Sequence, residues 1–229
     1  MKKSTTLVWL GLFLLDAVLH LVSTQIEGQL FNQVTKALLM PLLIVYAITK
    51  KSIIAPRLKR SLVIALLFSW VGDILLALPV SGYFIPGLAA FLVGHVVYIV
   101  AYGYASATYP LKVIWHRWWY SLPIVGYGFS FIAWLLPKLP SGLEIPVVLY
   151  ALVITVMLLA AAGRGKYTHP TSFIFVLLGA VFFALSDSMI AINRFVNPLE
   201  QGSLLIMSTY ILGQWLITEG LLRHPSPAE

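Results

Sequence analysis

Residues 84–105 read FIPGLAAFLVGHVVYIVAYGYA, a run that contains no Asp, Glu, Lys or Arg. A transmembrane helix needs about 20 consecutive, mainly apolar residues to cross the hydrocarbon core of a bilayer. This segment has that length and that composition, so we expect it to form a membrane-spanning helix.

Seven further runs of the same kind divide the rest of the chain. The eight predicted spans lie near residues 6–23, 33–49, 61–79, 84–105, 117–136, 143–162, 172–192 and 203–222. Prolines fall at or beside their boundaries, where a missing backbone hydrogen bond matters least. The pattern predicts an all-α fold: a polytopic integral membrane protein in which residues 1–229 form a single transmembrane domain of eight helices.

The composition agrees with a membrane protein. Hydrophobic residues make up 60% of the chain, charged residues only 10%, and the mean hydropathy is +0.92, whereas soluble domains carry roughly 25% charged residues. The absence of cysteine excludes disulfides and thiolate metal sites. The net charge of +7 lies in short loops rather than along one face, so we expect no nucleic-acid partner.

Charge asymmetry predicts the orientation, because Lys and Arg concentrate in cytoplasmic loops. With both termini cytoplasmic, only Lys138 and Arg194 lie in outer loops. The cations then placed on the cytoplasmic side are Lys2, Lys3, Lys50, Lys51, Arg57, Lys59, Arg60, Lys112, Arg117, Arg164, Lys166 and Arg223. We therefore expect cytoplasmic N- and C-termini. The N-terminal pair Lys2 and Lys3 and the short loops favour a bacterial inner membrane, although a protein of the endoplasmic reticulum could have the same pattern.

Several polar residues interrupt the predicted spans. They are Asp16, His20, Lys36, Asp73, His95 and Asp187, with Asn193 and Arg194 at the end of the seventh span. An ionisable side chain at the bilayer centre costs ~2.5–3.5 kcal/mol on insertion scales, so these groups should face the interior of the bundle. The predicted orientation gathers most of them in the outer half of the bilayer. Glu219 is the exception, and we expect it to be solvated at the inner surface.

Each of these residues also has a purely structural interpretation. The acids could be neutral and hydrogen-bonded to a neighbouring helix, Lys36 could extend to headgroups, and His95 could bond across a helix contact. Asp16 and His20, four residues apart on one helix face, could form a local pair at the rim of a site. Three acids in one layer nevertheless favour a functional site.

Known catalytic and metal motifs are missing from the sequence. It contains no H-x-x-x-H or H-E-x-x-H pattern, no G-x-S-x-G elbow, no P-loop and no Rossmann fingerprint. We therefore expect neither a metal nor another cofactor.

Five blocks, in order over roughly residues 30–220, carry a family resemblance. They are TKALLMP at 35–41, ALLFSWVGD at 65–73, FLVGHVVY at 91–98, GAVFFALSD at 179–187 with Asn193, Arg194 and Phe195, and YILGQ at 210–214. The chain resembles the YhhN-like, lysoplasmalogenase-type membrane proteins. The resemblance implies an eight-helix bundle that hydrolyses the vinyl ether bond of a lysoplasmalogen, releasing a fatty aldehyde and glycerophosphoethanolamine or glycerophosphocholine. The motif residues map onto Lys36, Asp73, His95, Asp187, Asn193, Tyr210 and Gln214.

This reaction needs an acid that protonates the β-carbon and an anion that stabilises the oxocarbenium ion. Asp73 and Asp187 are the predicted catalytic pair. Supporting roles in binding phosphate, orienting water or shaping the rim fall to Lys36, Arg194, His95, Tyr98, Tyr210, Gln214, Asn193, Asp16 and His20. The expected partners are a lysophospholipid substrate, which enters from the bilayer, and the bilayer itself, and the sequence identifies no protein partner.

Two other functions remain open at this point. One is a metal-dependent lipid amidase or esterase in a similar bundle. The other is a small proton-coupled transporter or sensor. Residues 68–78 resemble residues 182–192, which is compatible with a repeat of four helices plus four, and such repeats are common in transporters.

Overall fold

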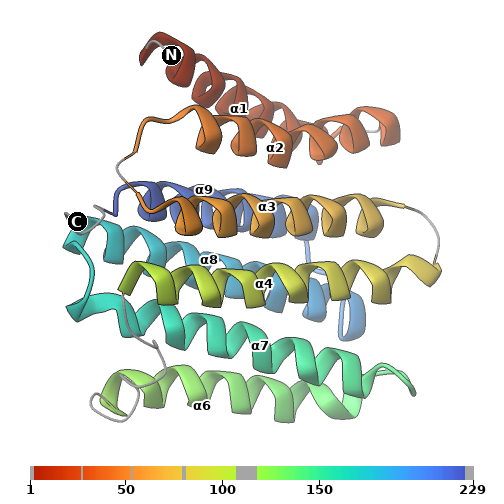
Figure 1. Cartoon of the computed structure of the whole chain (residues 1–229). Helices are drawn as coiled ribbons and strands as arrows, with labels where there is room; N and C mark the ends of the chain where they lie inside the picture. The colour runs from red at the N-terminus through yellow and green to blue at the C-terminus, as the bar shows by residue number, and fades with distance from the viewer. Residues whose placement is uncertain (1–2, 27, 53, 79–80, 107–117, 225–229) are drawn as a thin grey trace.

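The computed structural model of the chain describes residues 3–26, 28–52, 54–78, 81–106 and 118–224 (Figure 1). The long helices of these residues are α1 (Lys3–Ser23), α2 (Gln29–Thr49), α3 (Pro56–Ala77), α4 (Phe84–Ser106), α6 (Trp118–Leu135), α7 (Glu144–Gly163), α8 (Pro170–Phe195) and α9 (Gly202–Leu222). Short 3-10 turns, η1 (Ser81–Tyr83), η2 (Leu136–Lys138) and η3 (Arg164–Lys166), adjoin them. Residues 79 and 117, where predicted spans end or begin, lie outside the described residues, as do Lys2 and Lys112.

The predicted all-α membrane fold is confirmed, since the described residues contain helices and no strand. Seven of the long helices in this part of the chain have the length and hydropathy of a membrane span. The remaining one, α6, has 18 residues with Pro123 inside the helix and is not among these seven. The count of spans is thus close to the predicted eight.

Successive helices run in opposite directions, and the start of α1 and the end of α9 lie at the same end of the bundle (Figure 1). We call this the terminal end and the opposite one the distal end. The distal end gathers the C-terminal ends of α1, α3 and α8 and the N-terminal ends of α2, α4 and α9. Polar residues at those positions, far apart in sequence, therefore share one level of the bundle.

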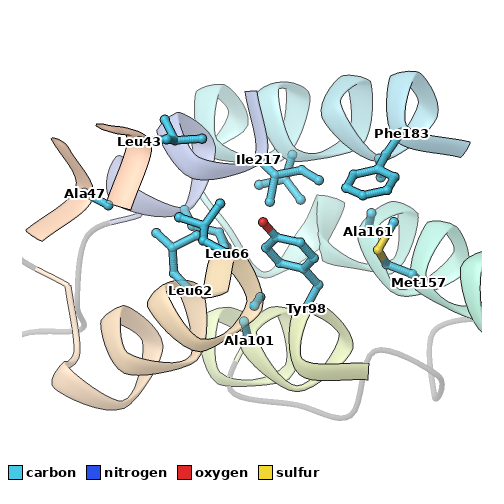
Figure 2. Packing of buried hydrophobic residues seen from close by; sticks show 14 of the residues in the cluster. Leu43, Ala47, Leu62, Leu66, Tyr98, Ala101, Met157, Ala161, Phe183 and Ile217 are labelled. Carbon is cyan, nitrogen blue, oxygen red and sulfur yellow. The ribbon is translucent and has the colours of Figure 1, made fainter. Parts of the chain in front are cut away.

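The core runs through the middle of the bundle (Figure 2). Buried side chains such as Leu43 of α2, Leu66 of α3, Tyr98 of α4, Met157 of α7 and Ile217 of α9 belong to one cluster. Large apolar side chains also cover the outside of the helices, as a surface in contact with lipid requires.

Helices α8 and α9 pack closely because glycines face each other across their contact. A Cβ atom added at Gly179 would lie 2.7 Å from the backbone nitrogen of Ile217 and 2.8 Å from the backbone oxygen of Gly213. Small residues allow membrane helices to approach in this way. The contact fixes the spacing between α8, which carries Asp187, and α9, which carries Tyr210.

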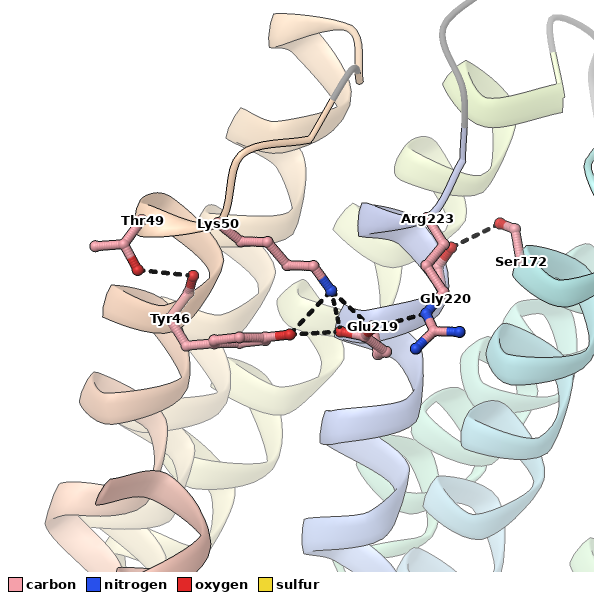
Figure 3. Close-up of polar contacts among 7 residues, drawn as sticks. All are labelled: Tyr46, Thr49, Lys50, Ser172, Glu219, Gly220 and Arg223. Atoms are coloured by element: carbon pink, nitrogen blue, oxygen red, sulfur yellow. Dashed lines mark hydrogen bonds and ion pairs between the residues drawn. The ribbon is translucent and has the colours of Figure 1, made fainter. Parts of the chain in front are cut away.

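A buried acid joins α2 to α9 near the terminal end (Figure 3). Glu219 is only 4% exposed. Its carboxylate accepts hydrogen bonds from Tyr46 Oη at 2.6 Å, from Lys50 Nζ at 2.6 and 2.7 Å and from Arg223 Nε at 2.7 Å. The expectation of a solvated Glu219 is therefore wrong, because three donors near the ends of α2 and α9 replace the water.

Arg164 is also buried rather than exposed in a loop. Its Nη2 donates to Ser172 Oγ at 3.0 Å, and Ser172 Oγ donates to the backbone oxygen of Gly220 at 2.6 Å (Figure 3). This arginine thus ties the end of α7 to α8 and α9.

We expect Glu219→Gln to lower the stability of the protein by on the order of 2 kcal/mol, because it leaves Lys50 and Arg223 close together without a countercharge. This is less than for a fully buried pair, since Lys50 is 23% exposed and can reach water. The apparent melting temperature in detergent measures the change. Glu200→Gln, at an exposed acid, is the matched control, and equal melting temperatures for the two variants would contradict the prediction.

Candidate functional site

A cavity of about 490 Å³ opens near the distal end of the bundle. Helices α1, α2, α3, α4, α8 and α9 line it. Its polar lining includes His20, Ser23, Gln29, Asn32, Lys36, Asp73, Ser186, Asp187, Asn193, Arg194, Ser203 and Tyr210. Ionisable groups gathered around a cavity at membrane depth mark a functional site.

Asp73 of α3 is held by a chain of hydrogen bonds. Its carboxyl is 3% exposed, and Tyr210 Oη donates to Oδ2 at 2.6 Å. Gln214 Nε2 donates to Tyr210 Oη at 3.4 Å, and Tyr98 Oη donates to Gln214 Oε1 at 2.6 Å. Asp73 and Tyr210 line the cavity, whereas Gln214 and Tyr98 lie behind them and fix their orientation.

Asp187 of α8 has a different pair of neighbours. Tyr150 Oη of α7 donates to its Oδ2 at 2.5 Å, and His95 Nε2 of α4 lies 3.8 Å from the same oxygen. Neither ring nitrogen of His95 has a hydrogen-bond partner, and its ring stands edge-on to Tyr150 and Phe183. His95 is thus beside the carboxyl without yet bonding to it.

A wall of aromatic rings that belong to the core cluster packs beside the two acids. The ring of Phe91 packs edge-on against those of Tyr210 and Phe183 at centroid distances of 5.9 and 6.4 Å. A Cβ atom added at Gly72 would lie 2.5 Å from the Phe91 ring. The glycine immediately before Asp73 therefore makes room for this wall.

Two cations line the cavity beside the acids. Lys36 of α2 is half-buried and makes no hydrogen bond or ion pair with the residues that the structure describes. The guanidinium carbon of Arg194 lies 3.9 Å from the centroid of the Phe84 ring. Asn193, next to it, uses Oδ1 to accept from the backbone nitrogen of Leu199 at 2.8 Å and so shapes the turn after α8. The two cations can hold an anion at the cavity.

Asp16 and His20 do not form the local pair that their spacing allowed. His20 lines the cavity, and its Nδ1 lies 2.9 Å from Thr35 Oγ1 of α2. Asp16 is buried on α1 away from the cavity lining, with no hydrogen-bond partner at Oδ2. The structure thus brings together all the predicted site residues except Asp16, some in the lining and some directly behind it.

Tyr150, the direct partner of Asp187, was not among the predicted site residues. It is a polar side chain well inside an apolar span, between the interfaces where tyrosines usually gather. A tyrosine at that depth could have been selected as a candidate site residue on this ground.

No group of three or more His, Asp or Glu side chains is placed to hold a metal ion in the described part of the chain. His20 and His95, the two intramembrane histidines, lie beside different partners. The arrangement gives no support to the metal-dependent alternative.

Comparison with known proteins gives a consistent picture. The model of the YhhN family matches residues 31–221. The chain is 33% identical over 163 residues to the human protein "Lysoplasmalogenase TMEM86B", covering 71% of this chain and 64% of the relative. It is 33% identical over 177 residues to a protein of Mycobacterium bovis named "Lysoplasmalogenase", covering 72% of this chain and 61% of the relative.

A further relative, human "Lysoplasmalogenase TMEM86A", is 31% identical over 173 residues, which is 72% of this chain and 67% of the relative. The chain thus spans a little under two thirds of the length of the first two relatives. No solved structure matches it.

Proposed function

Because the chain belongs to the YhhN family, we propose that it hydrolyses the vinyl ether bond of lysoplasmalogens. The products are a fatty aldehyde and glycerophosphoethanolamine or glycerophosphocholine. The names of its relatives support this substrate class. The observation that carries the proposal is the pair of carboxyls from α3 and α8 that line one cavity, each with a tyrosine donor.

The geometry suits the chemistry of a vinyl ether. A carboxylic acid protonates the β-carbon, which breaks the carbon–carbon π bond and leaves an oxocarbenium ion. The second carboxylate stabilises that cation and takes a proton from the attacking water, which bonds to the α-carbon. The resulting hemiacetal loses its hydroxyl proton, and the glycerol oxygen leaves with a proton. Asp73 and Asp187 supply the two carboxyls.

The charged mouth of the cavity suits the rest of the substrate. Lys36 has no partner among the described residues, and Arg194 lies over an aromatic ring with its donors available. A guanidinium and an ammonium are common ligands of phosphate. In this proposal the two side chains bind the phosphodiester, and His95 forms a hydrogen bond with Asp187 when the substrate is bound.

The test is incubation of purified protein in detergent with three lysolipids that differ only at the first glycerol oxygen: alkenyl, alkyl and acyl. We expect aldehyde release from the alkenyl lipid alone, with no membrane gradient and in the presence of a chelator. Release of fatty acid from the acyl lipid, or activity that the chelator abolishes, would support the amidase or esterase. Proton movement in liposomes without aldehyde release would instead support a transporter.

We further propose that the protein lies in a bacterial inner membrane with its terminal end in the cytoplasm. The Lys and Arg residues of its loops support this orientation. Reporter fusions truncated after Lys59 or Arg164, or placed at the C-terminus, should report cytoplasm. Fusions after Gln29, Leu139 or Gln201 should report the opposite side. A C-terminus on the opposite side would reverse the orientation and move the cavity to the cytoplasmic leaflet.

A further inference from the structure

Asp187 lines more than the large cavity. Two small cavities, of about 50 and about 40 Å³, reach it from between α6, α7 and α8 and from between α4, α7 and α8. Both are also lined by Val147, Tyr150 and Ala191. We call the two cavities together the α7–α8 groove. Asp187 is thus the acid at which the polar cavity and this groove meet.

The groove presents an apolar surface. Its hydroxyl groups are already engaged: Tyr127 Oη and Ser188 Oγ lie 2.6 Å apart, Tyr150 bonds to Asp187, and Thr155 donates to a backbone carbonyl of α7 at 2.7 Å. Asp187 is the single acid of this lining, which contains no Lys, Arg or His. Such an apolar surface suits a hydrocarbon chain and not a headgroup. The two cavities are too small to enclose a whole chain, and Tyr127 of their lining is 42% exposed, so a chain in the groove has one side against the helices and the other side in the bilayer.

The groove also has the direction and length that a lipid tail needs. Its α7 lining runs from Val147 to Leu158, which at 1.5 Å per residue is about 16 Å. Since α7 runs from the distal end toward the terminal end, the groove descends from the level of the polar cavity toward the middle of the bundle (Figure 1). This length is about half of the ~30 Å hydrocarbon core, the depth of one leaflet.

A further cavity beside the acids is less suitable for the tail. It has a volume of about 180 Å³, lies between α2 and α3, and is lined by Gln33, Lys36 and Asp73. Its lining covers only residues 33–37 and 73–78, so it stays close to the distal end and is partly polar. It fits the glycerophosphate part of a lipid better than its chain.

We propose that the α7–α8 groove seats the alkenyl chain of the lysolipid while its phosphate end occupies the polar cavity. This inference rests on the proposed function and adds the direction of the substrate. The vinyl ether then lies at Asp187, with the β-carbon on the tail side. Asp187 therefore donates the proton to the β-carbon, and Asp73, on the headgroup side, takes the proton from the water that bonds to the α-carbon. Asp73 passes that proton to the departing glycerol oxygen, and the hydroxyl proton of the hemiacetal restores Asp187.

The first test narrows the groove. Ala151→Leu adds three carbons to its lining, and we expect it to lower kcat/KM for a 16-carbon alkenyl chain about tenfold relative to a 4-carbon chain, as overpacking of a filled site does. Ala133→Leu, on the exposed face of α6, and Ala37→Leu, in the cavity between α2 and α3, are matched controls. A folded Ala151→Leu protein with an unchanged ratio would overturn the proposal, as would a changed ratio in Ala37→Leu alone.

The second test needs neither a variant nor turnover. A saturated ether lysolipid with a diazirine in its chain, which the protein cannot cleave, is photolysed on the wild-type protein and the labelled peptides are mapped. We expect label on residues 124–135 and 147–158, and label confined to residues 33–37 and 74–78 would overturn the groove. If the lipid labels the groove but the protein releases no aldehyde from any alkenyl lipid, the proposed function is rejected and the binding site is retained. The failure of the function and the failure of the groove are therefore distinguishable.

Discussion

Replacing Asp73 or Asp187 by Asn is expected to lower turnover on a lysoplasmalogen by at least ~10²-fold, the scale of lost acid–base catalysis. Asn keeps the size of Asp and an oxygen that accepts from Tyr210 or Tyr150, but its amide is neither a general acid nor a general base at neutral pH. Binding of a saturated ether lysolipid should change far less. A fall in kcat with intact folding and binding would therefore assign the carboxyls to the reaction.

Two further variants sharpen this prediction. Residues that act on one transition state are non-additive, so the double Asn variant should be barely slower than the slower single variant. Asp16→Asn changes a third buried membrane acid that lies outside the cavity lining, and it should keep most of the activity. Near-wild-type turnover in either Asp73→Asn or Asp187→Asn would remove that residue from the mechanism.

The pH dependence of kcat/KM separates the two roles. A donor must be protonated and its partner ionised, so the wild-type profile should be bell-shaped. If Asp187 is the donor, Asp187→Asn should abolish the fall in kcat/KM at high pH, and Asp73→Asn should abolish its rise at low pH. The reverse assignment would follow if the two variants exchanged these effects.

Much of the fold could be predicted because a bilayer imposes a simple rule on sequence. Runs such as residues 84–105 contain no Asp, Glu, Lys or Arg, and their length and apolar composition predict a span. The same rule selected Asp73 and Asp187, because an acid is costly inside such a run. It did not require knowledge of which helices are neighbours.

The partners of these residues could not be predicted, since they depend on how distant helices pack. Tyr150 meets Asp187 because α7 packs against α8, and a single sequence contains no record of that contact. Glu219 is not solvated as expected, because Lys50, 169 positions away in the sequence, donates a hydrogen bond to its carboxylate. Local spacing also misled: His20 bonds to Thr35 of α2 rather than pairing with Asp16.

The α8–α9 contact leads to the second large effect. We expect Gly179→Leu to lower the stability by at least ~3 kcal/mol, the upper range of overpacking, and to reduce or abolish the folded peak in size-exclusion chromatography of detergent extracts. Two of the three nearest atoms that its Cβ would meet are backbone atoms of Ile217 and Gly213, so rotation of a side chain cannot relieve the whole clash. Gly11→Leu on α1, where nothing lies within 4 Å of an added Cβ, should behave like the wild type.

Gly179→Ala connects this packing to the site. It adds only the Cβ atom, so the clash is the same but the added volume is small, and a fraction of the protein should still fold with α8 and α9 pushed apart. Asp187 on α8 would then lie farther from Tyr210 on α9, and so farther from Asp73, to which Tyr210 donates its hydrogen bond. We therefore expect the folded fraction to bind the ether lysolipid more weakly and to turn over lysoplasmalogen more slowly than wild type, at equal protein concentration. Wild-type stability and turnover in Gly179→Ala would show that α8 and α9 do not need this close approach, and that the spacing of the two carboxyls is set elsewhere in the bundle.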